Sequence, residues 1–415
     1  MMSKEKRRVP KLRFPGFTED WEQRKLNEFL SVSNFKNTEN KYNKTDVLSV
    51  SGDYGIVNQI DFQGRSFAGA SVSNYGVVEK GDIVYTKSPL KLNPYGIIKT
   101  NRLNNGIVST LYAIYKTKEN CNSKFIEHYF NLDSRLNQYL KPLVNKGAKN
   151  DMKVSSENVL IGEVCFPKIT EQALIADFLD CLDIYITLHQ RKLDNLKLKK
   201  KALLQKLFPK NGERYPELRF PGFTDAWEQR KLSDISTKVT TKNVDVHYTE
   251  TLTNSAEQGI ISQVDFFDKE ISNKDNINGY YIVDNNDFIY NPRISTLAPV
   301  GPINRNKLNR TGIMSPLYTV FRSSNVDLGF LEWYFQSSHW HRYMKLNGDS
   351  GVRADRIAIK DSTFFEMPIK IPVNIKEQVL IGETLEKFNQ YITLHQRKLE
   401  HLKLQKKALL QQMFV

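Results

Sequence analysis

Two stretches of the chain repeat apolar residues at the spacing of a long amphipathic helix. From Glu171 to Phe208 there is no glycine or proline, and one heptad register runs throughout. The stretch 375–415 carries the same register. We predict two long helices that pack through these seams as an antiparallel coiled coil. The predicted apolar contacts are Leu179, Leu182, Ile186, Leu193, Leu196 and Leu203 in the first helix and Leu385, Phe388, Ile392, Leu399, Leu402 and Leu409 in the second.

Polar residues interrupt each seam at two matching places. His189 and Lys200 lie in the first seam, and His395 and Lys406 lie in the second. A polar residue at such a position often fixes the register of a coiled coil. We therefore interpret these four residues as register-setting, and we expect no catalytic or metal-binding role for them.

The segments that precede the helices show a different pattern. Short runs rich in β-branched and aromatic residues, punctuated by Gly, Asn and Asp, predict strands, and longer amphipathic segments predict helices. Together they indicate α+β domains with a mixed or antiparallel sheet. The predicted strands are 81–86, 107–116, 286–291 and 313–322, and the predicted helices are 124–140 and 329–345.

The 415-residue chain consists of two tandem copies of one sequence unit. The segment 10–26 returns at 216–232 with fourteen of its seventeen positions identical, and YITLHQRKL at 185–193 returns unchanged at 391–399. Both pairs are offset by 206 residues. A tandem duplication predicts the same fold twice. The divergence between the anchors indicates two different surfaces, either for two targets or through neutral drift.

The repeat defines two pseudo-symmetric domains, each followed by a long helix. The predicted boundaries are 1–168 for the first domain, 169–210 for the first helix and linker, 211–374 for the second domain, and 375–415 for the second helix. Pro209 and Gly212 end the first helical pattern, because neither residue continues a helix well.

The charge balance points to a polyanionic partner. Lysine and arginine total 60 against 46 acidic residues, which gives a net charge of +14 and a pI near 9.3. Nucleic acid is the first candidate, and an anionic membrane surface is the second. No apolar run is long enough to span a membrane, and no secretory signal is evident. Three cysteines without a CxxC spacing favour a reducing cytoplasm over a disulfide scaffold or a cysteine-based zinc site.

The motifs of common enzymes are missing from the sequence. There is no GxxxxGK[ST] loop, no GxGxxG after a strand, and no HExxH histidine pair. Asn93-Pro94-Tyr95 and Asn291-Pro292-Arg293 lack the second proline of the Asn-Pro-Pro-aromatic loop of DNA amino-methyltransferases. We therefore expect that this chain catalyses nothing itself and binds no metal or cofactor.

Cations and amides in the divergent loops are the candidate DNA contacts. Glycine lets a backbone approach phosphate closely, while Lys or Arg can neutralise a phosphate or bind guanine, and Asn can bind adenine. Such loops occur at equivalent places in both copies. The candidates are Tyr54, Lys87, Ser88, Lys91, Asn93, Lys146, Lys149, Asn150 and Lys153 in the first copy and Asn254, Gln258, Asn291, Arg293, Ser295, Arg353 and Arg356 in the second.

The repeated anchors LRFPGF…WEQRKL and EQ…YITLHQRKL…LLQ resemble those of the specificity subunit of type I restriction–modification enzymes, over essentially the whole chain. The resemblance implies that each variable domain is a target recognition domain for one half of a split sequence in double-stranded DNA. It implies that the helices form a spacer that sets the unread gap. It further implies two modification subunits, which methylate adenine with S-adenosylmethionine, and two restriction subunits, which are motor–nucleases that use ATP and Mg.

Other interpretations fit the residues as well. A non-catalytic coiled-coil scaffold with two peptide-binding domains would show the same seam, and a silent specificity allele would show the same anchors. A stand-alone DNA enzyme is disfavoured by the missing cofactor loop.

Overall fold

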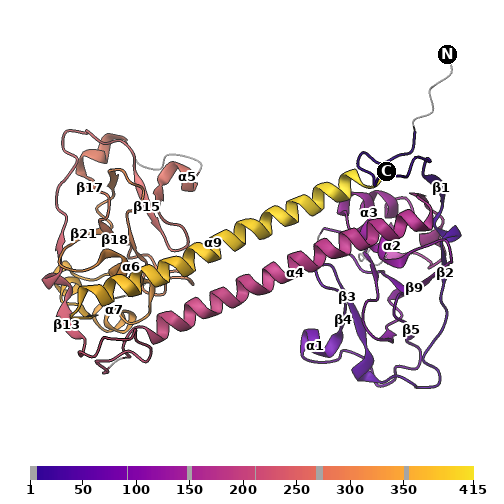
Figure 1. Cartoon of the computed structure of the whole chain (residues 1–415), viewed down its shortest axis with the longest axis horizontal. Coiled ribbons are helices and arrows are strands. Elements are labelled where there is room, and N and C mark those ends of the chain that lie inside the picture. Colours follow the sequence, from indigo (N-terminus) through magenta and orange to yellow (C-terminus); the bar gives the residue numbers. More distant parts are fainter. Residues whose placement is uncertain (1–6, 91, 147–151, 211, 268–273, 350–354) are drawn as a thin grey trace, which may run out of the picture. The chain divides into compact units, whose positions relative to one another are not determined.

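The computed structural model describes residues 7–90, 92–146, 152–210, 212–267, 274–349 and 355–415. The chain divides into two compact units (Figure 1): unit 1 comprises residues 1–190 and 397–415, and unit 2 comprises residues 191–396. Each unit contains one α+β domain, the first part of the long helix that follows it, and the last part of the other long helix. The predicted α+β fold class is confirmed.

Unit 1 is built on an antiparallel four-stranded sheet, surrounded by two-stranded pairs and short helices. The sheet has the order β2 (Leu30–Val32), β9 (Tyr112–Thr117), β6 (Ile83–Thr86) and β7 (Ile98–Thr100). The pairs are β1 (Glu22–Lys25) with β12 (Glu163–Phe166), β3 (Leu48–Ser51) with β4 (Gly55–Asn58), β5 (Gly76–Val78) with β8 (Gly106–Val108), and β10 (Asn145–Lys146) with β11 (Met152–Lys153). The helices are α1 (Gln59–Gln63), α2 (Ser123–Phe130), α3 (Asp133–Leu140) and the start of α4 (Ile169–Lys206).

Both faces of the unit 1 sheet are buried, which explains why the sequence of β6 has apolar residues at consecutive positions. Ile83 and Tyr85 point into the main core beside α2, whereas Val84 belongs to a second, smaller core on the other face. Successive strand residues face opposite sides, so a strand covered on both sides needs apolar residues at every position.

Unit 2 repeats this architecture with a sheet in the order β14 (Ser236–Lys238), β21 (Thr319–Ser323), β18 (Phe288–Tyr290) and β19 (Ile303–Arg305). Its pairs are β13 (Glu228–Lys231) with β22 (Pro368–Ile371), β15 (Leu252–Ser255) with β16 (Gly259–Ser262), and β17 (Tyr281–Val283) with β20 (Gly312–Met314). Its helices are α5 (Gln263–Phe267), α6 (Leu328–Gln336), α7 (His341–Asn347), α8 (Asp361–Phe365) and the start of α9 (Ile375–Gln412). Short 3-10 helices lie at Leu26–Glu28, Lys44–Asp46, Asn158–Leu160, Leu232–Asp234 and Lys274–Gly279.

Four predicted elements are each split in the structure. The predicted strand 107–116 is two strands, β8 and β9, because a turn at Ser109 redirects the chain, with Tyr112 N donating to Ser109 O. The predicted helix 124–140 is α2 and α3, because Asn131 caps the first and Leu132 is extended. The predicted strand 313–322 is likewise two strands, β20 and β21, with Tyr318 N donating to Ser315 O in the turn between them. The predicted helix 329–345 is α6 and α7, because the backbone of Ser337 is extended.

The first turn of each long helix is fixed to its own domain by a repeated pair of contacts. Arg13 forms a bidentate ion pair with Glu171 at 2.7 and 2.8 Å. Gln172 accepts a hydrogen bond from the backbone of Asn122 at 2.9 Å. Unit 2 repeats both contacts at equivalent positions, with Arg219–Glu377 at 2.8 and 2.9 Å and Asp327 N–Gln378 at 2.9 Å. The LRFPGF and EQ anchors of the sequence therefore meet in space.

The last residues of the other long helix complete each core. Phe414, which follows α9, packs in the unit 1 core against the buried Trp21 and Phe125. Phe208, which follows α4, packs in the unit 2 core against the buried Trp227. Trp21 and Trp227, the aromatic residues of the repeated anchor, therefore serve packing.

Candidate nucleic-acid interface

Segments far apart in the sequence meet at the end of strand β18 in unit 2. Asn254, on β15, is only 2% exposed, and its amide donates to the carbonyl oxygen of Ile289 at 2.7 Å. The Asn291 amide donates to the carbonyl oxygen of Asn254 at 2.9 Å and ties loop 291–301 to the β15–β16 hairpin. The structure therefore places Asn254 inside the domain, where it positions loops instead of facing DNA.

Two arginines in this region face each other across a backbone bridge. Arg293 pairs with Arg356 in an antiparallel bridge, and Ile294 N donates to Asp355 O at 2.8 Å beside it. Side chains of directly paired residues lie on the same face, where like charges destabilise each other. Both arginines are exposed, and the Asp355 carboxylate is 4.0 Å from Arg356 Nε. An anion bound between the two guanidinium groups would remove their repulsion.

The equivalent loop of unit 1, residues 87–97, follows β6. Lys87 Nζ donates to Ser156 Oγ at 3.5 Å, which links this loop to the segment after β11, and Ser88 is exposed. Asn93 is only 8% exposed, and its amide donates to Asp133 at 2.8 Å. Asn93 therefore positions the loop from inside the domain, as Asn254 does in unit 2, and this corrects the expectation that both amides face DNA.

Three of the remaining predicted contacts are exposed on loops or hairpin tips. Tyr54, at the tip of the β3–β4 hairpin, is 70% exposed, and its ring centroid is 5.4 Å from that of Phe62. Gln258 is exposed at the tip of the β15–β16 hairpin, and Ser295 is exposed in the loop after β18. The predicted contacts Lys91, Lys149, Asn150 and Arg353 lie outside the described residues. Lys146 lies on β10, and Lys153 lies on β11.

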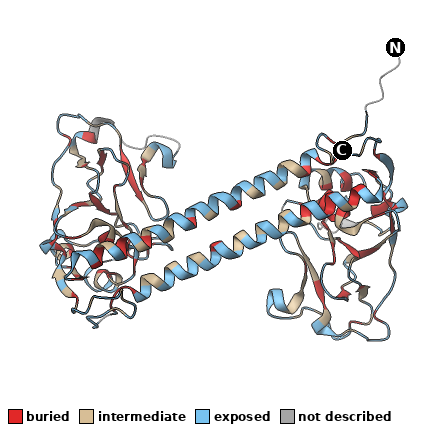
Figure 2. Ribbon diagram, viewed as in Figure 1, coloured by how far each residue is buried: buried red, intermediate tan, exposed pale blue. Residues whose placement is uncertain are grey.

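The two long helices run antiparallel within each unit. In unit 1 the start of α4 packs beside the end of α9, and in unit 2 the end of α4 packs beside the start of α9. Every predicted seam residue is at least half-buried, and the buried ones recur along the helices (Figure 2). The seam residues with the least exposure are Leu179, Leu193, Leu385, Ile392 and Leu399.

The seam lysines bind partners that differ between the units. Lys406 Nζ lies 2.5 Å from the Asp183 carboxylate in unit 1. In unit 2 Lys200 donates to the Asn389 side chain at 2.8 Å and lies 4.5 Å from the centroid of the Trp333 ring. Burial lowers the pKa of Lys200. Each lysine contacts a polar side chain of the facing long helix, which supports the interpretation that it sets the helix register.

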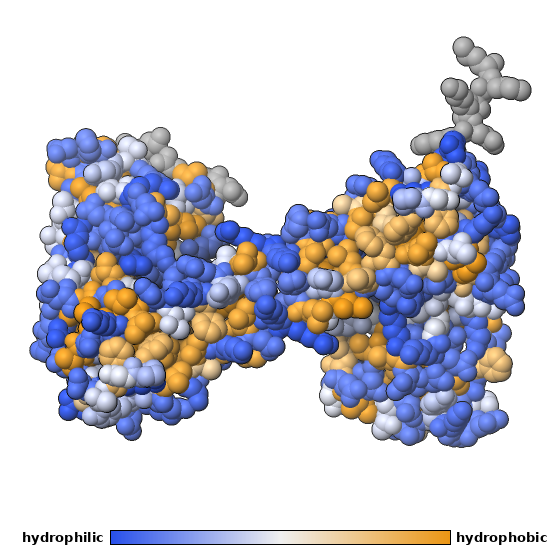
Figure 3. Space-filling view, viewed as in Figure 1, coloured by the Kyte–Doolittle hydropathy of each residue, from blue (hydrophilic) through white to orange (hydrophobic). Residues whose placement is uncertain are grey.

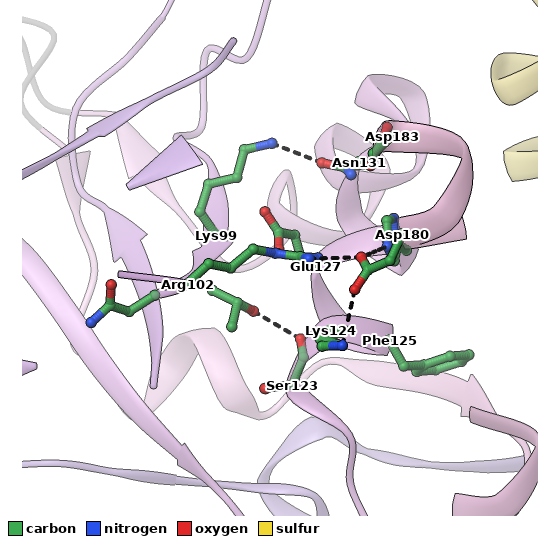
Figure 4. A network of polar contacts seen from close by, with 12 residues as sticks. Lys99, Arg102, Ser123, Lys124, Phe125, Glu127, Asn131, Asp180 and Asp183 are labelled. Carbon is green, nitrogen blue, oxygen red and sulfur yellow. Dashed lines mark hydrogen bonds and ion pairs between the residues drawn. The ribbon is translucent and has the colours of Figure 1, made fainter. Parts of the chain in front are cut away.

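A charged network joins α2 to α4 in unit 1 (Figure 4). The Asp180 carboxylate accepts from His128 at 2.8 Å, Arg102 at 2.7 Å and Lys124 at 3.1 Å, and Arg102 also binds Glu127 at 2.7 Å. Burial opposes ionisation of Asp180, but these hydrogen bonds together outweigh it and lower its pKa. The sequence analysis missed this network, because its members are spread over three separate segments.

Apolar residues also lie on the outer faces of both long helices. Tyr185 and Leu188 on α4 are each 55% exposed, and the equivalent Tyr391 and Leu394 on α9 are 57% and 60% exposed. Figure 3 shows apolar side chains at the surface of the helical segments of unit 1. Exposed apolar residues gathered in one region are typical of a protein–protein contact.

The described residues include no group of three or more His, Cys, Asp or Glu side chains arranged to hold a metal ion. Among the described helices, none is both long and apolar enough to cross a membrane.

The chain belongs to the family of type I restriction–modification DNA specificity domains. The family model matches twice, at residues 18–198 and 224–404. The chain is therefore a type I specificity subunit with two DNA recognition domains.

Solved structures share this fold. The S subunit of a type I restriction–modification system from M. genitalium matches with 12% identity and a TM-score of 0.58, over 98% of this chain and 99% of that one. A structure described as the basis of complex assembly and conformational transition of the type I R-M system matches with 16% identity and a TM-score of 0.50, over 98% and 99%. Comparison with curated proteins gave no match.

Proposed function

We propose that each recognition domain reads one half of a split DNA target and that the helical spacer fixes the unread gap between the halves. The opposed Arg293 and Arg356 carry this proposal, because two exposed guanidinium groups held on one face suit a phosphate or a guanine edge. The net charge of +14 supports the same kind of partner.

The repeated exposed residues of α4 and α9 support a second part of the proposal. We infer that two modification subunits dock on these helices, one through Tyr185 and Leu188 and the other through Tyr391 and Leu394. S-adenosylmethionine then belongs to the modification subunits, and ATP and Mg belong to the two restriction subunits that join them. The chain itself supplies sequence recognition and no catalytic group, and it works in the cytoplasm.

The test is to map adenine methylation in a host that has none of its own. The chain is expressed with its modification subunit, without it, and as the double variant Arg293→Ala/Arg356→Ala together with it. We expect a new split motif only with both wild-type proteins. The double variant is expected to lose or relax the half-site read by unit 2 and to retain the other half-site, because each well-placed base contact contributes about 1–3 kcal/mol of discrimination.

Three outcomes would contradict the proposal in whole or in part. A stable complex of both proteins that methylates no site and binds DNA without sequence preference would indicate a scaffold, whereas specific binding without methylation would indicate a silent allele. A double variant with an unchanged motif would remove the arginine pair from the interface.

A further inference from the structure

The two residues that bound a four-residue turn are joined by the same backbone hydrogen bonds in both recognition domains, although the sequence of the turn differs. In unit 1, Leu90 and Asn93 exchange two backbone hydrogen bonds, with N–O distances of 3.0 and 3.2 Å. In unit 2, Ser295 and Ala298 exchange the same two bonds, at 3.0 and 3.1 Å. The turns occupy equivalent places, in the loops that follow β6 and β18.

Each turn holds an exposed leucine at its third position. Leu92 and Leu297 are both 69% exposed, so neither side chain contributes to the core of its domain. Leucine is the one residue type that the two four-residue turns share at an equivalent position, since the segments read Leu-Lys-Leu-Asn and Ser-Thr-Leu-Ala. We call Leu92 and Leu297 the tip leucines.

The residues after each turn have the same backbone conformation in both copies. A proline and a glycine follow the leucine at the same spacing in both copies. Gly96 and Gly301 have φ of 91° and 81°, a conformation that favours glycine, and their amides close a further turn at 3.1 Å. A Cβ at Gly301 would lie 2.0 Å from the Asn291 carbonyl oxygen. Backbone geometry explains the proline and the glycine, but it does not explain an exposed leucine.

The turns lie within the candidate nucleic-acid interface. Ser295, the first residue of the unit 2 turn, comes two residues after Arg293, which faces Arg356. In unit 1 the turn begins three residues after Lys87, which contacts the segment following the β10–β11 hairpin. An exposed apolar side chain in a loop near cationic side chains suits insertion into a base stack, as other DNA-binding proteins do with leucine wedges.

Two domains that read different half-sites need different base-reading residues, so a shared side chain serves a step that both half-sites share. Under the proposed function, that step is methylation of an adenine in each half-site. The target base must leave the duplex to reach a methyltransferase, which costs stacking and pairing energy.

We propose that the tip leucines enter the DNA at the target base pair and fill the space in the stack that the extruded adenine leaves. This inference rests on the proposed function. Leu92 acts at the half-site read by unit 1, and Leu297 acts at the half-site read by unit 2.

The test uses the complex of the full chain with its modification subunit and a duplex that carries the mapped motif. The variants are Leu92→Ala and Leu297→Ala, and Leu92→Met tests rescue by a similar apolar side chain. Leu90→Ala is the matched control, since Leu90 is a 39% exposed leucine in the same turn. Methylation is followed separately at each half-site, and 2-aminopurine in place of each target adenine reports unstacking.

We expect Leu92→Ala to slow methylation at one half-site by about tenfold or more and to reduce the 2-aminopurine signal there, because extrusion loses its support. The other half-site is unaffected, and Leu297→Ala gives the reciprocal pattern. Leu92→Met and Leu90→Ala behave as wild type. A mismatched base opposite the target adenine restores the rate, because that base pair is already weak.

Three results would overturn the inference while the wild-type complex still methylates its motif. Unchanged rates at both half-sites would show that the tip leucines have no role in methylation. A changed half-site sequence would make them base readers, for example of a thymine methyl group. Loss of the modification subunit would make them a protein contact. If the wild-type complex methylates nothing, the proposed function itself fails.

Discussion

Replacing Phe414 by alanine should loosen unit 1 and leave unit 2 intact. The Phe414 side chain is 4% exposed, and its ring centroid lies 5.4 Å from that of Phe125 and 5.7 Å from that of Tyr129. The Arg135 guanidinium lies 5.0 Å from the same ring. Removing a buried phenylalanine from such a site costs about 3–5 kcal/mol. At about 1.4 kcal/mol per factor of ten, unit 1 should open roughly a hundredfold to several thousandfold more often.

Hydrogen exchange read by mass spectrometry measures this opening segment by segment. Amides of β6 and β9 should exchange faster in Phe414→Ala, whereas those of β18 and β21 should not change. Phe208→Ala is the reciprocal variant, since Phe208 packs on Trp227 and Phe330 in unit 2. Leu404→Ala is the surface control, because Leu404, on α9, is 67% exposed. Equal protection of β6 in wild type and Phe414→Ala would refute the assignment of Phe414 to the unit 1 core.

The remaining predictions concern the anchors, the charges and the spacer. Arg13→Ala leaves the buried Glu171 carboxylate without its ion-pair partner, so the free energy of unfolding measured by urea titration should fall by about 3–5 kcal/mol. The double variant Arg13→Met/Glu171→Met should recover most of this lost free energy, because it removes both charges. The pKa of Asp180 is lower in the folded than in the unfolded chain, so its carboxylate stabilises the fold at neutral pH. This stabilisation is lost as the pH falls below 3.8, the ordinary pKa of an aspartate. Thermal melts of Asp180→Asn should therefore depend less on pH in this range than those of the wild type. Adding one heptad to both α4 and α9 lengthens the spacer by about 10 Å. The mapped gap should then grow by about three base pairs at ~3.4 Å each, with both half-sites unchanged; an unchanged gap in a functional complex would contradict the spacer role.

The helices and the duplication were predictable because they depend on periodicity. A seam that repeats every seven residues specifies which face of a helix is buried, independently of the structure of the neighbouring domain. The seam residues from Leu179 to Leu203 could therefore be assigned to that face from their spacing alone. The splits at Ser109 and at Asn131 could not be assigned in this way. Each depends on a single turn or cap inside a segment whose apolar pattern continues across it.

The candidate site was only partly predictable, because a sequence gives residue types but not the direction in which a side chain points. Asn93 and Asn254 carry the amide that suits adenine, yet both are buried and donate to other residues of the domain. Arg293 and Arg356 were selected for their charge alone, and the bridge that sets them opposite each other joins loops more than 60 residues apart. That juxtaposition, and not the abundance of lysine and arginine, distinguishes a place for an anion from an ordinary basic surface, because directly paired residues hold two like charges on one face.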